Sequence, residues 1–245
     1  MSPRTFTPSV LANISRALKP PSLPPIIPPH TQTTTSNRPP TDAAVLIPLM
    51  NINSEPHILM EVRANNMRVH AGEASFPGGK ADDTDRDLIH TALREAHEEL
   101  ALPPSSVEIL GMLDPEYSLG NRSRVWPFVG FIHSAPPPLS SAGSSLSSLP
   151  LSSLTLSSAE VSAILPLPLS ALSDPRRRSI HLFRLNRFRP YYKIRADDLV
   201  IPLPGNEVNI PAHLEIWGLS GWLLNKFAEK VGWLDAPEIE KSPED

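Results

Sequence analysis

The sequence predicts a fold of the α/β class, and three observations carry this prediction. Short apolar segments typical of buried strands lie on both sides of a long amphipathic helical pattern. A second amphipathic helical pattern stands near the C-terminus. The length of 245 residues suits one sizeable core and would leave two independent domains cramped.

The first expected elements are two strands joined by a turn. Residues 43–49 and 57–62 each form an apolar run, and the mainly polar residues 51–56 separate them. The sequence therefore predicts a β-hairpin that leads directly into the motifs described below.

A helix is expected next. Its start is marked by Asp83-Thr84-Asp85, with Asp87 three residues after Thr84 as a capping-box partner, and its end is marked by Pro103-Pro104. The apolar residues between these points recur at steps of three or four and form one stripe: Ile89, Ala92, Leu93, Ala96 and Leu100.

Two further strands and a closing helix complete the expected core. The apolar runs 107–113 and 125–132 predict strands that resume the sheet after the helix. Between His213 and Val231 the spacing predicts a helix with one apolar face, formed by Leu214, Trp217, Leu224 and Phe227.

Three segments differ in composition from the domain predicted over residues 42–235. Residues 1–41 hold the densest set of the 30 prolines and predict an extended N-terminal arm with one short helix at 10–18. Residues 134–158 are dominated by Ser, Leu and Pro and predict a low-complexity insertion. Residues 236–245 form a C-terminal tail.

The N-terminal arm permits two interpretations. It has basic residues and no acidic residue before Asp42, which is the composition of a mitochondrial transit peptide. A proline-rich extension with a helix that docks on the domain is the interpretation we favour. We therefore expect an intracellular protein, cytoplasmic or mitochondrial, and the C-terminal residues form no peroxisomal signal.

Charge and composition exclude several function classes. The net charge of −4 and pI near 6.1 provide no basic field for non-specific nucleic-acid binding. No apolar run reaches the roughly 18 residues that a membrane span needs. The absence of cysteine excludes disulfides, thiolate catalysis and cysteine zinc sites. We expect a small-molecule substrate, with neither nucleic acid nor membrane as partner; the oligomeric state is left open.

The expected helix carries a carboxylate cluster beside its apolar stripe. Glu95, Glu98 and Glu99 stand at i, i+3 and i+4 and therefore share one face. Neighbouring like charges destabilise an isolated helix by roughly a few tenths of a kcal/mol per pair, so the cluster favours a hard cation such as Mg²⁺ or Mn²⁺. An ordinary solvated face, helped by pairing of Arg94 with Glu98, is the alternative that the helix alone leaves open.

A glycine turn and two arginines precede this helix. Gly78 and Gly79 follow Phe-Pro and, lacking a Cβ, allow the backbone to approach a metal ion or phosphates closely. Arg63 and Arg68 can fork onto phosphate oxygens, although either one alone would be an ordinary surface charge.

Together these residues resemble the signature of the Nudix hydrolase family. That signature is Gly, five residues, Glu, seven residues, then Arg-Glu-apolar-x-Glu-Glu-x-Gly-apolar. The chain has Gly79, five residues, Asp85, eight residues, and then Arg94-Glu95-Ala96-His97-Glu98-Glu99-Leu100-Ala101-Leu102. It differs in having Asp85 for Glu, a gap one residue longer, and Ala101 for the late glycine.

A second motif resembles the coenzyme A pyrophosphatase branch of that family, as do the Asp and the longer gap. The branch pattern is Leu-Leu/Met-Thr-x-Arg-Ser/Ala, three residues, Arg, three residues, Gly, three residues, Phe-Pro-Gly-Gly. The chain matches it from Leu59 to Gly79, with Arg63 and Arg68 in register. Only Glu61 differs, where threonine is usual.

The resemblance implies an α/β/α sandwich with a mixed β-sheet and hydrolysis of the diphosphate of coenzyme A or acyl-coenzyme A. The products would be 4′-phosphopantetheine, or its acyl form, and adenosine 3′,5′-bisphosphate. It implies that Mg²⁺ or Mn²⁺ is held by the catalytic Glu95, Glu98 and Glu99, and that substrate is bound by Arg63, Arg68, Gly78 and Gly79.

Some points stay open. Glu160 is a candidate additional ligand or base, with a surface carboxylate as the alternative. The spacing does not decide which carboxylate is the base. A Nudix hydrolase for another nucleoside diphosphate derivative and a non-catalytic binding module on the same fold are the alternative functions.

Overall fold

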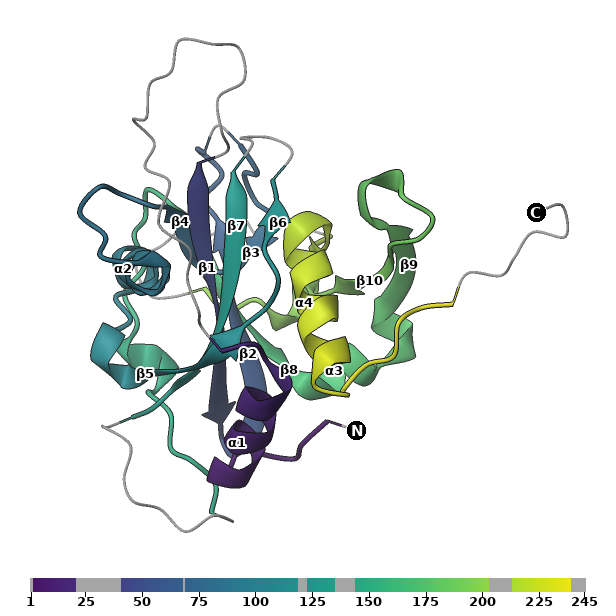
Figure 1. Cartoon of the computed structure of the whole chain (residues 1–245), viewed down its shortest axis with the longest axis horizontal. Helices are drawn as coiled ribbons and strands as arrows, with labels where there is room; N and C mark the ends of the chain where they lie inside the picture. Colours follow the sequence, from purple (N-terminus) through teal and green to yellow (C-terminus); the bar gives the residue numbers. More distant parts are fainter. Residues whose placement is uncertain are drawn as a thin grey trace, which may run out of the picture.

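The computed structural model describes residues 2–20, 41–67, 69–118, 123–134, 144–202 and 213–238. Within them the chain forms a main sheet of eight strands, a small sheet of three strands and four α-helices (Figure 1). The main sheet contains β1 (Asp42–Ile52), β2 (Glu55–Arg63), β3 (Ala74–Ser75), β4 (Gly78–Lys80), β5 (Val107–Met112), β6 (Glu116–Tyr117), β7 (Arg124–Ile132) and β8 (Val161–Pro168).

The main sheet is mixed. Its central order is β3-β2-β1-β7-β5, while β4 pairs with β1, β6 with β7 and β8 with β2. Strands β1 and β7 run parallel, whereas β1 with β2 and β5 with β7 run antiparallel. The small sheet has the order β11-β10-β9 and consists of β9 (Arg178–Leu182), β10 (Pro190–Arg195) and β11 (Glu215–Ile216).

Helices cover both faces of the main sheet. They are α1 (Pro8–Ala17), α2 (Leu88–Leu100), the short α3 (Leu169–Ser173) and α4 (Gly218–Lys230). In Figure 1, α2 lies on one side of β1 and β7 while α4 lies on the other. The α/β/α sandwich with a mixed sheet that the sequence predicts is therefore confirmed.

Alternate residues of the strands feed two separate cores. On β1, Leu46 packs in the core that contains Ala92 and Ala96 of α2. Its neighbour Ile47 packs in the other core, together with Leu224 of α4. This alternation follows from the period of two along a strand, and it fixes which side chains of the sheet face α2.

The predicted hairpin forms with a shorter turn than expected. Ile52 pairs with Glu55, so the turn contains only Asn53 and Ser54, at φ of 51° and 66°. Two residues at positive φ match the twist of a two-residue hairpin, and asparagine tolerates this region well.

The start of α2 differs from the prediction. Asp87, not Thr84, is the N-cap, and its side chain accepts a hydrogen bond from the backbone N–H of His90 at 2.7 Å. The capping-box interpretation was wrong because Asp85, one residue after Thr84, is drawn into the buried contacts described below. The helix ends as expected before Pro103, with Ala101 in the left-handed region at φ 54°.

The N-terminal helix packs into the domain. Phe6, Leu11 and Ile14 are buried in the core that also holds Leu224 of α4. The docking helix expected near 10–18 is confirmed, and it argues against a cleaved transit peptide because cleavage after this helix would remove four core side chains, Leu18 being the fourth. Residues 21–40 of the predicted arm lie outside the described residues.

The closing helix begins later than predicted. Glu215 and Ile216 form β11, which pairs with β10, so α4 starts only at Gly218. Trp217, expected on the apolar face, is the N-cap residue and is 45% exposed. No helix among the described residues has the length and apolar character to cross a bilayer.

The described half of the serine-rich segment lies against the domain. Asn51 donates from its side chain to the carbonyl of Leu146 at 2.8 Å. The backbone N–H of Ser157 donates to the carbonyl of Glu99 at 2.9 Å, so the segment reaches the C-terminal end of α2. Residues 135–143 lie outside the described residues.

Candidate functional site

The glycine turn lies between β1 and α2. Gly78 pairs with Val45 of β1, and a Cβ on Gly78 would stand 2.3 Å from the carbonyl oxygen of Ala44. Its φ of 150° also disfavours other residues. The backbone N–H of Gly78 donates to Oε2 of Glu99 at 2.8 Å. Gly78 therefore holds β4 against β1 and anchors one carboxylate of the helix.

Gly79 makes room for a second carboxylate. A Cβ on Gly79 would stand 2.5 Å from Cδ and from Oε1 of Glu95. The side chain of Glu95 thus packs directly on the Gly79 backbone. Glu95 and Glu99 stand four residues apart on α2, and neither Gly78 nor Gly79 has a Cβ. Both carboxylates can therefore lie against the Gly78-Gly79 turn.

Arg94 links Glu98 to Glu95 through hydrogen bonds. Nη1 of Arg94 donates to Oε1 of Glu95 and to Oε2 of Glu98, each at 3.0 Å. The side chain of Glu98 is half-exposed, whereas that of Glu95 is mostly buried. The expected pairing of Arg94 with Glu98 is present, and the same guanidinium nitrogen joins both acids.

Asp85 fixes the other side of Arg94. Nε and Nη2 of Arg94 donate to the two oxygens of Asp85 at 2.9 and 3.0 Å, a bidentate pair. Burial alone would raise the pKa of Asp85, but hydrogen bonds from Arg94, the N–H of Asp82 and the hydroxyl of Thr91 hold that pKa well below its usual range. Asp85 is therefore a charged anchor that orients Arg94.

The carboxylates at the turn repel one another. Burial, followed by repulsion from Glu61, raises the pKa of Glu99 to about 10, and the N–H of Gly78 offsets only part of this. Burial also raises the pKa of Glu95. The site therefore disfavours several uncompensated negative charges and would be stabilised by a cation.

Glu61 is a member of the site that the sequence did not identify. Its side chain is fully buried on β2, and burial raises its pKa to about 7, with repulsion from Glu160 and Glu95 adding to the shift. The signal that was available is the strand period: Leu59 is an α2-side core residue, so Glu61, two residues later, faces the same side.

Arg63 follows Glu61 on that face. Its Nη1 lies 3.8 Å from Oε1 of Glu61 and 4.0 Å from Oε1 of Glu99. The structure thus brings Arg63 beside the acids of α2. Arg68, the second predicted phosphate-binding residue, lies outside the described residues, so its role stays a prediction.

Glu160 lies in the turn before β8. Its carbonyl accepts from the N–H of Ala64 at 2.8 Å, which ties it to the end of β2. Its carboxylate contributes to the repulsion felt by Glu61 and Glu95. Glu160 is therefore close enough to remain a candidate ligand or base.

The donors at this turn suit a hard divalent cation. They are carboxylate oxygens, which Mg²⁺ and Mn²⁺ prefer, and Oε2 of Glu61 is a buried oxygen with no hydrogen-bond partner in the described part of the chain. As they stand, the described His, Asp and Glu side chains do not form a closed group of three or more around one cation position. In particular, Glu98 is turned toward Arg94.

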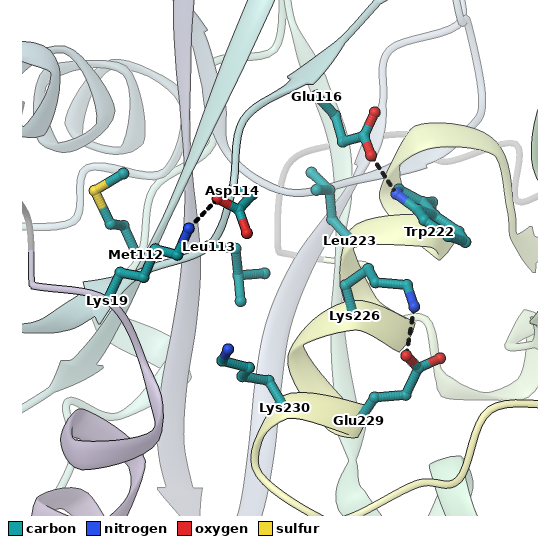
Figure 2. Close-up of a pocket in the computed structure, with 10 residues that line it drawn as sticks. All are labelled: Lys19, Met112, Leu113, Asp114, Glu116, Trp222, Leu223, Lys226, Glu229 and Lys230. Atoms are coloured by element: carbon teal, nitrogen blue, oxygen red, sulfur yellow. Dashed lines mark hydrogen bonds and ion pairs between the residues drawn. The ribbon is translucent and has the colours of Figure 1, made fainter. Parts of the chain in front are cut away.

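A separate cavity of about 470 Å³ lies between α4, the end of β5 and Lys19, which is two residues beyond α1 (Figure 2). Three lysines and three acids line it, with paired charges such as Lys19 with Asp114 and Lys226 with Glu229. Trp222 donates to Glu116 at its rim. None of the predicted site residues lines this cavity, so it is distinct from the acids of α2.

Comparison with known proteins identifies the class first. A sequence profile described as NUDIX domain matches residues 40–142. A protein of Enterobacter sp. (strain 638), named "Uncharacterized Nudix hydrolase NudL", is 36% identical over 191 residues, covering 78% of this chain and 82% of the relative. The NudL protein of Escherichia fergusonii is 36% identical over 190 residues with the same coverage.

The chain therefore belongs to the Nudix hydrolase family. It is a hydrolase of a pyrophosphate substrate, and enzymes of this family generally use divalent metals such as Mg²⁺ or Mn²⁺.

Solved structures are similar at greater distance. The NUDIX domain of Shewanella oneidensis NrtR with ADP-ribose is 18% identical, with TM-score 0.40, covering 58% of this chain and 82% of that chain. A C. elegans Ap4A hydrolase complex is 15% identical, with TM-score 0.39, covering 53% and 81%. At this distance neither structure informs the substrate of this chain.

Proposed function

We propose that the substrate is coenzyme A or an acyl-coenzyme A, cleaved at its diphosphate to 4′-phosphopantetheine, or its acyl form, and adenosine 3′,5′-bisphosphate. The observation that supports this proposal is that residues of both motifs lie beside the carboxylate of Glu99. Gly78 of the Phe-Pro-Gly-Gly turn donates to Oε2 of Glu99, and Arg63 of the upstream motif lies 4.0 Å from Oε1 of the same residue.

The side chains of the site have different roles in the proposed reaction. Glu95, Glu98 and Glu99 would hold Mg²⁺ or Mn²⁺, and Glu160 is a candidate for a further contact. When bound, the metal would polarise the phosphoryl oxygens and lower the pKa of the attacking water. Arg94 positions Glu95 and Glu98 through its shared Nη1.

Substrate phosphates would meet the arginines of the upstream motif. Arg63 lies beside the acids and can fork onto phosphate oxygens of the diphosphate. Arg68 would contribute a second guanidinium, and the backbone at Gly78 and Gly79 allows the phosphates to approach closely. This arrangement would direct two guanidinium groups to the substrate phosphates and leave the carboxylates to the metal.

Hydrolysis of another nucleoside diphosphate derivative is the second candidate. It is favoured by two residues that differ from the patterns above: Glu61, where the coenzyme A branch has threonine, and Ala101, where the general signature has glycine. Glu61 lies at the site itself, so it could change which substrate is accepted.

The test is a panel of coenzyme A, NADH, ADP-ribose and dinucleoside polyphosphates, each incubated with the protein and Mn²⁺. We expect the highest kcat/KM with coenzyme A or a thioester. A clear preference for another member would select the second candidate, and silence with every member would favour a non-catalytic module.

A variant pair tests the proposed metal site in the same assay. Glu98→Gln should abolish metal-dependent turnover without unfolding the protein, because its side chain is half-exposed. Glu108→Gln, at a similarly exposed carboxylate that pairs with His133 on the sheet, should keep normal turnover. Normal rates for Glu98→Gln would remove this residue from the mechanism.

A further inference from the structure

We propose that Glu61 is an additional oxygen ligand of the divalent metal site, supplied by the sheet opposite the carboxylates of α2. This inference rests on the metal-dependent reaction proposed above. It adds to that reaction a residue which stands where the coenzyme A pattern has threonine.

Glu61 lies on the face of β2 that is turned toward α2. Ile58, Met60 and Val62 of β2 pack in the core on the α4 side of the sheet, whereas Leu59 packs in the core under α2. Because side chains alternate along a strand, Glu61 and Arg63 continue the α2 side from Leu59. The carboxylate of Glu61 therefore faces the helix that carries the other acids.

The carboxylate of Glu61 is only partly paired. The side chain of Glu61 is 0% exposed, and its Oε1 accepts from the hydroxyl of Ser75 at 3.1 Å. Nη1 of Arg63 is 3.8 Å from that same oxygen, beyond hydrogen-bond distance. Oε2 has no hydrogen-bond partner among the described residues. A buried carboxylate costs several kcal/mol unless it is paired and hydrogen-bonded; Arg63 offsets part of this charge, but Oε2 itself has no donor among the described residues.

Other carboxylates lie near Glu61. Glu61 is close enough to Glu95, Glu99 and Glu160 for each to repel it or be repelled by it. These acids come from α2 and from the turn before β8, so, with Glu61 on β2, carboxylates from three parts of the chain lie near one another. A protein core would not accumulate them for packing alone, because hydrophobic residues of similar volume are often more stabilising.

A divalent cation accounts for both observations. Mg²⁺ and Mn²⁺ take carboxylate oxygens in preference to other donors, and a bound cation would reduce the repulsion among the acids. Threonine, the usual residue of the branch, offers a neutral hydroxyl in place of an anionic oxygen. Glu61 would therefore increase the negative charge of the site and its affinity for the metal.

The test compares Mn²⁺ binding by the full chain and by Glu61→Gln, which keeps the side-chain shape and removes the charge. Glu108→Gln is the matched control, since it removes one carboxylate from the sheet away from this site. Bound Mn²⁺ is measured by electron paramagnetic resonance without substrate, and the Tm is measured with and without Mn²⁺.

We expect Glu61→Gln to weaken Mn²⁺ binding by about 10-fold or more and to reduce the Mn²⁺-induced rise in Tm. The control should match the wild type in both measurements. If the glutamine variant does not fold, Glu61→Thr, which introduces the residue usual in the branch, is expected to show the same two losses.

Two results would overturn the inference, and they are distinguishable. Wild-type Mn²⁺ affinity in folded Glu61→Gln, together with lost affinity in Glu95→Gln, would exclude Glu61 as a ligand and leave the proposed function standing. No Mn²⁺ binding and no hydrolysis by the wild type would overturn both proposals together.

Discussion

Gly79→Ala should damage the reaction far more than the fold. The new Cβ would stand 2.5 Å from Cδ of Glu95, whereas ordinary contacts begin at 3.4 Å, so the carboxylate must move by about 0.9 Å (3.4 minus 2.5). Misplacement of a catalytic group by about 1 Å can cost about 100-fold in rate. We therefore expect kcat/KM to fall by about 100-fold. Stability should change little, because the displaced atoms end a flexible side chain.

The assay is steady-state hydrolysis of coenzyme A with Mn²⁺, with Tm measured on the same samples. Gly78→Ala is the contrasting variant: its Cβ would collide with the backbone of β1 at 2.3 Å, so it should lose stability first. Near-normal kcat/KM for Gly79→Ala would refute the reasoning, because it would show that the position of Glu95 does not matter to the reaction.

Three further predictions follow from the same region. Ala101→Gly should stabilise the protein by about 1 kcal/mol, seen as a Tm higher by about 2–4 °C, because Ala101 has φ 54°; an unchanged Tm would contradict this. Arg94→Lys should lose the bidentate bonds to Asp85 and lower both Tm and kcat/KM, and a wild-type kcat/KM would refute its positioning role. Burial raises the pKa of Glu61 from 4.5 to about 7, so the folded protein binds the extra proton and metal-free stability should fall as the pH rises through this window. Chemical denaturation at several pH values measures the free energy of unfolding. The prediction would be contradicted if this free energy depended on pH in Glu61→Gln as it does in the wild type.

Local patterns predicted much of the fold. The apolar steps of α2 identified the side that packs on the sheet, because Ala92 and Ala96 lie in the core beneath it. The strands 107–113 and 125–132 correspond to β5 and β7. The period of the apolar residues reflects which side chains are buried, and this burial stabilises these helices and strands.

Element ends were predicted less well because distant residues decide them. Threonine is a favoured N-cap residue, so Thr84 was expected to begin the helix. Instead, Arg94 of α2 donates to Asp85, and Asp87 is the N-cap residue. The early part of the closing helix became β11 because β10 was available to pair with it. Neither partner is visible in the local sequence.

The candidate site was predicted in part. The structure brings Glu95, Glu99, Gly78 and Gly79 together, as the spacing indicates. Glu61 was noted only as a departure from a pattern, because its relation to α2 depends on which face of β2 the helix covers. Once the sheet is known, Glu61 can be assigned to the α2 side, because Leu59, two residues earlier on β2, packs on that side.

The central claim is that these carboxylates support metal-dependent cleavage of the coenzyme A diphosphate. Phosphorus NMR of coenzyme A incubated with the protein tests it most directly. We expect adenosine 3′,5′-bisphosphate and 4′-phosphopantetheine to appear in equal amounts with Mg²⁺ or Mn²⁺, to cease with EDTA and to resume when metal is restored. Intact coenzyme A under conditions in which the protein consumes another diphosphate would contradict the claim.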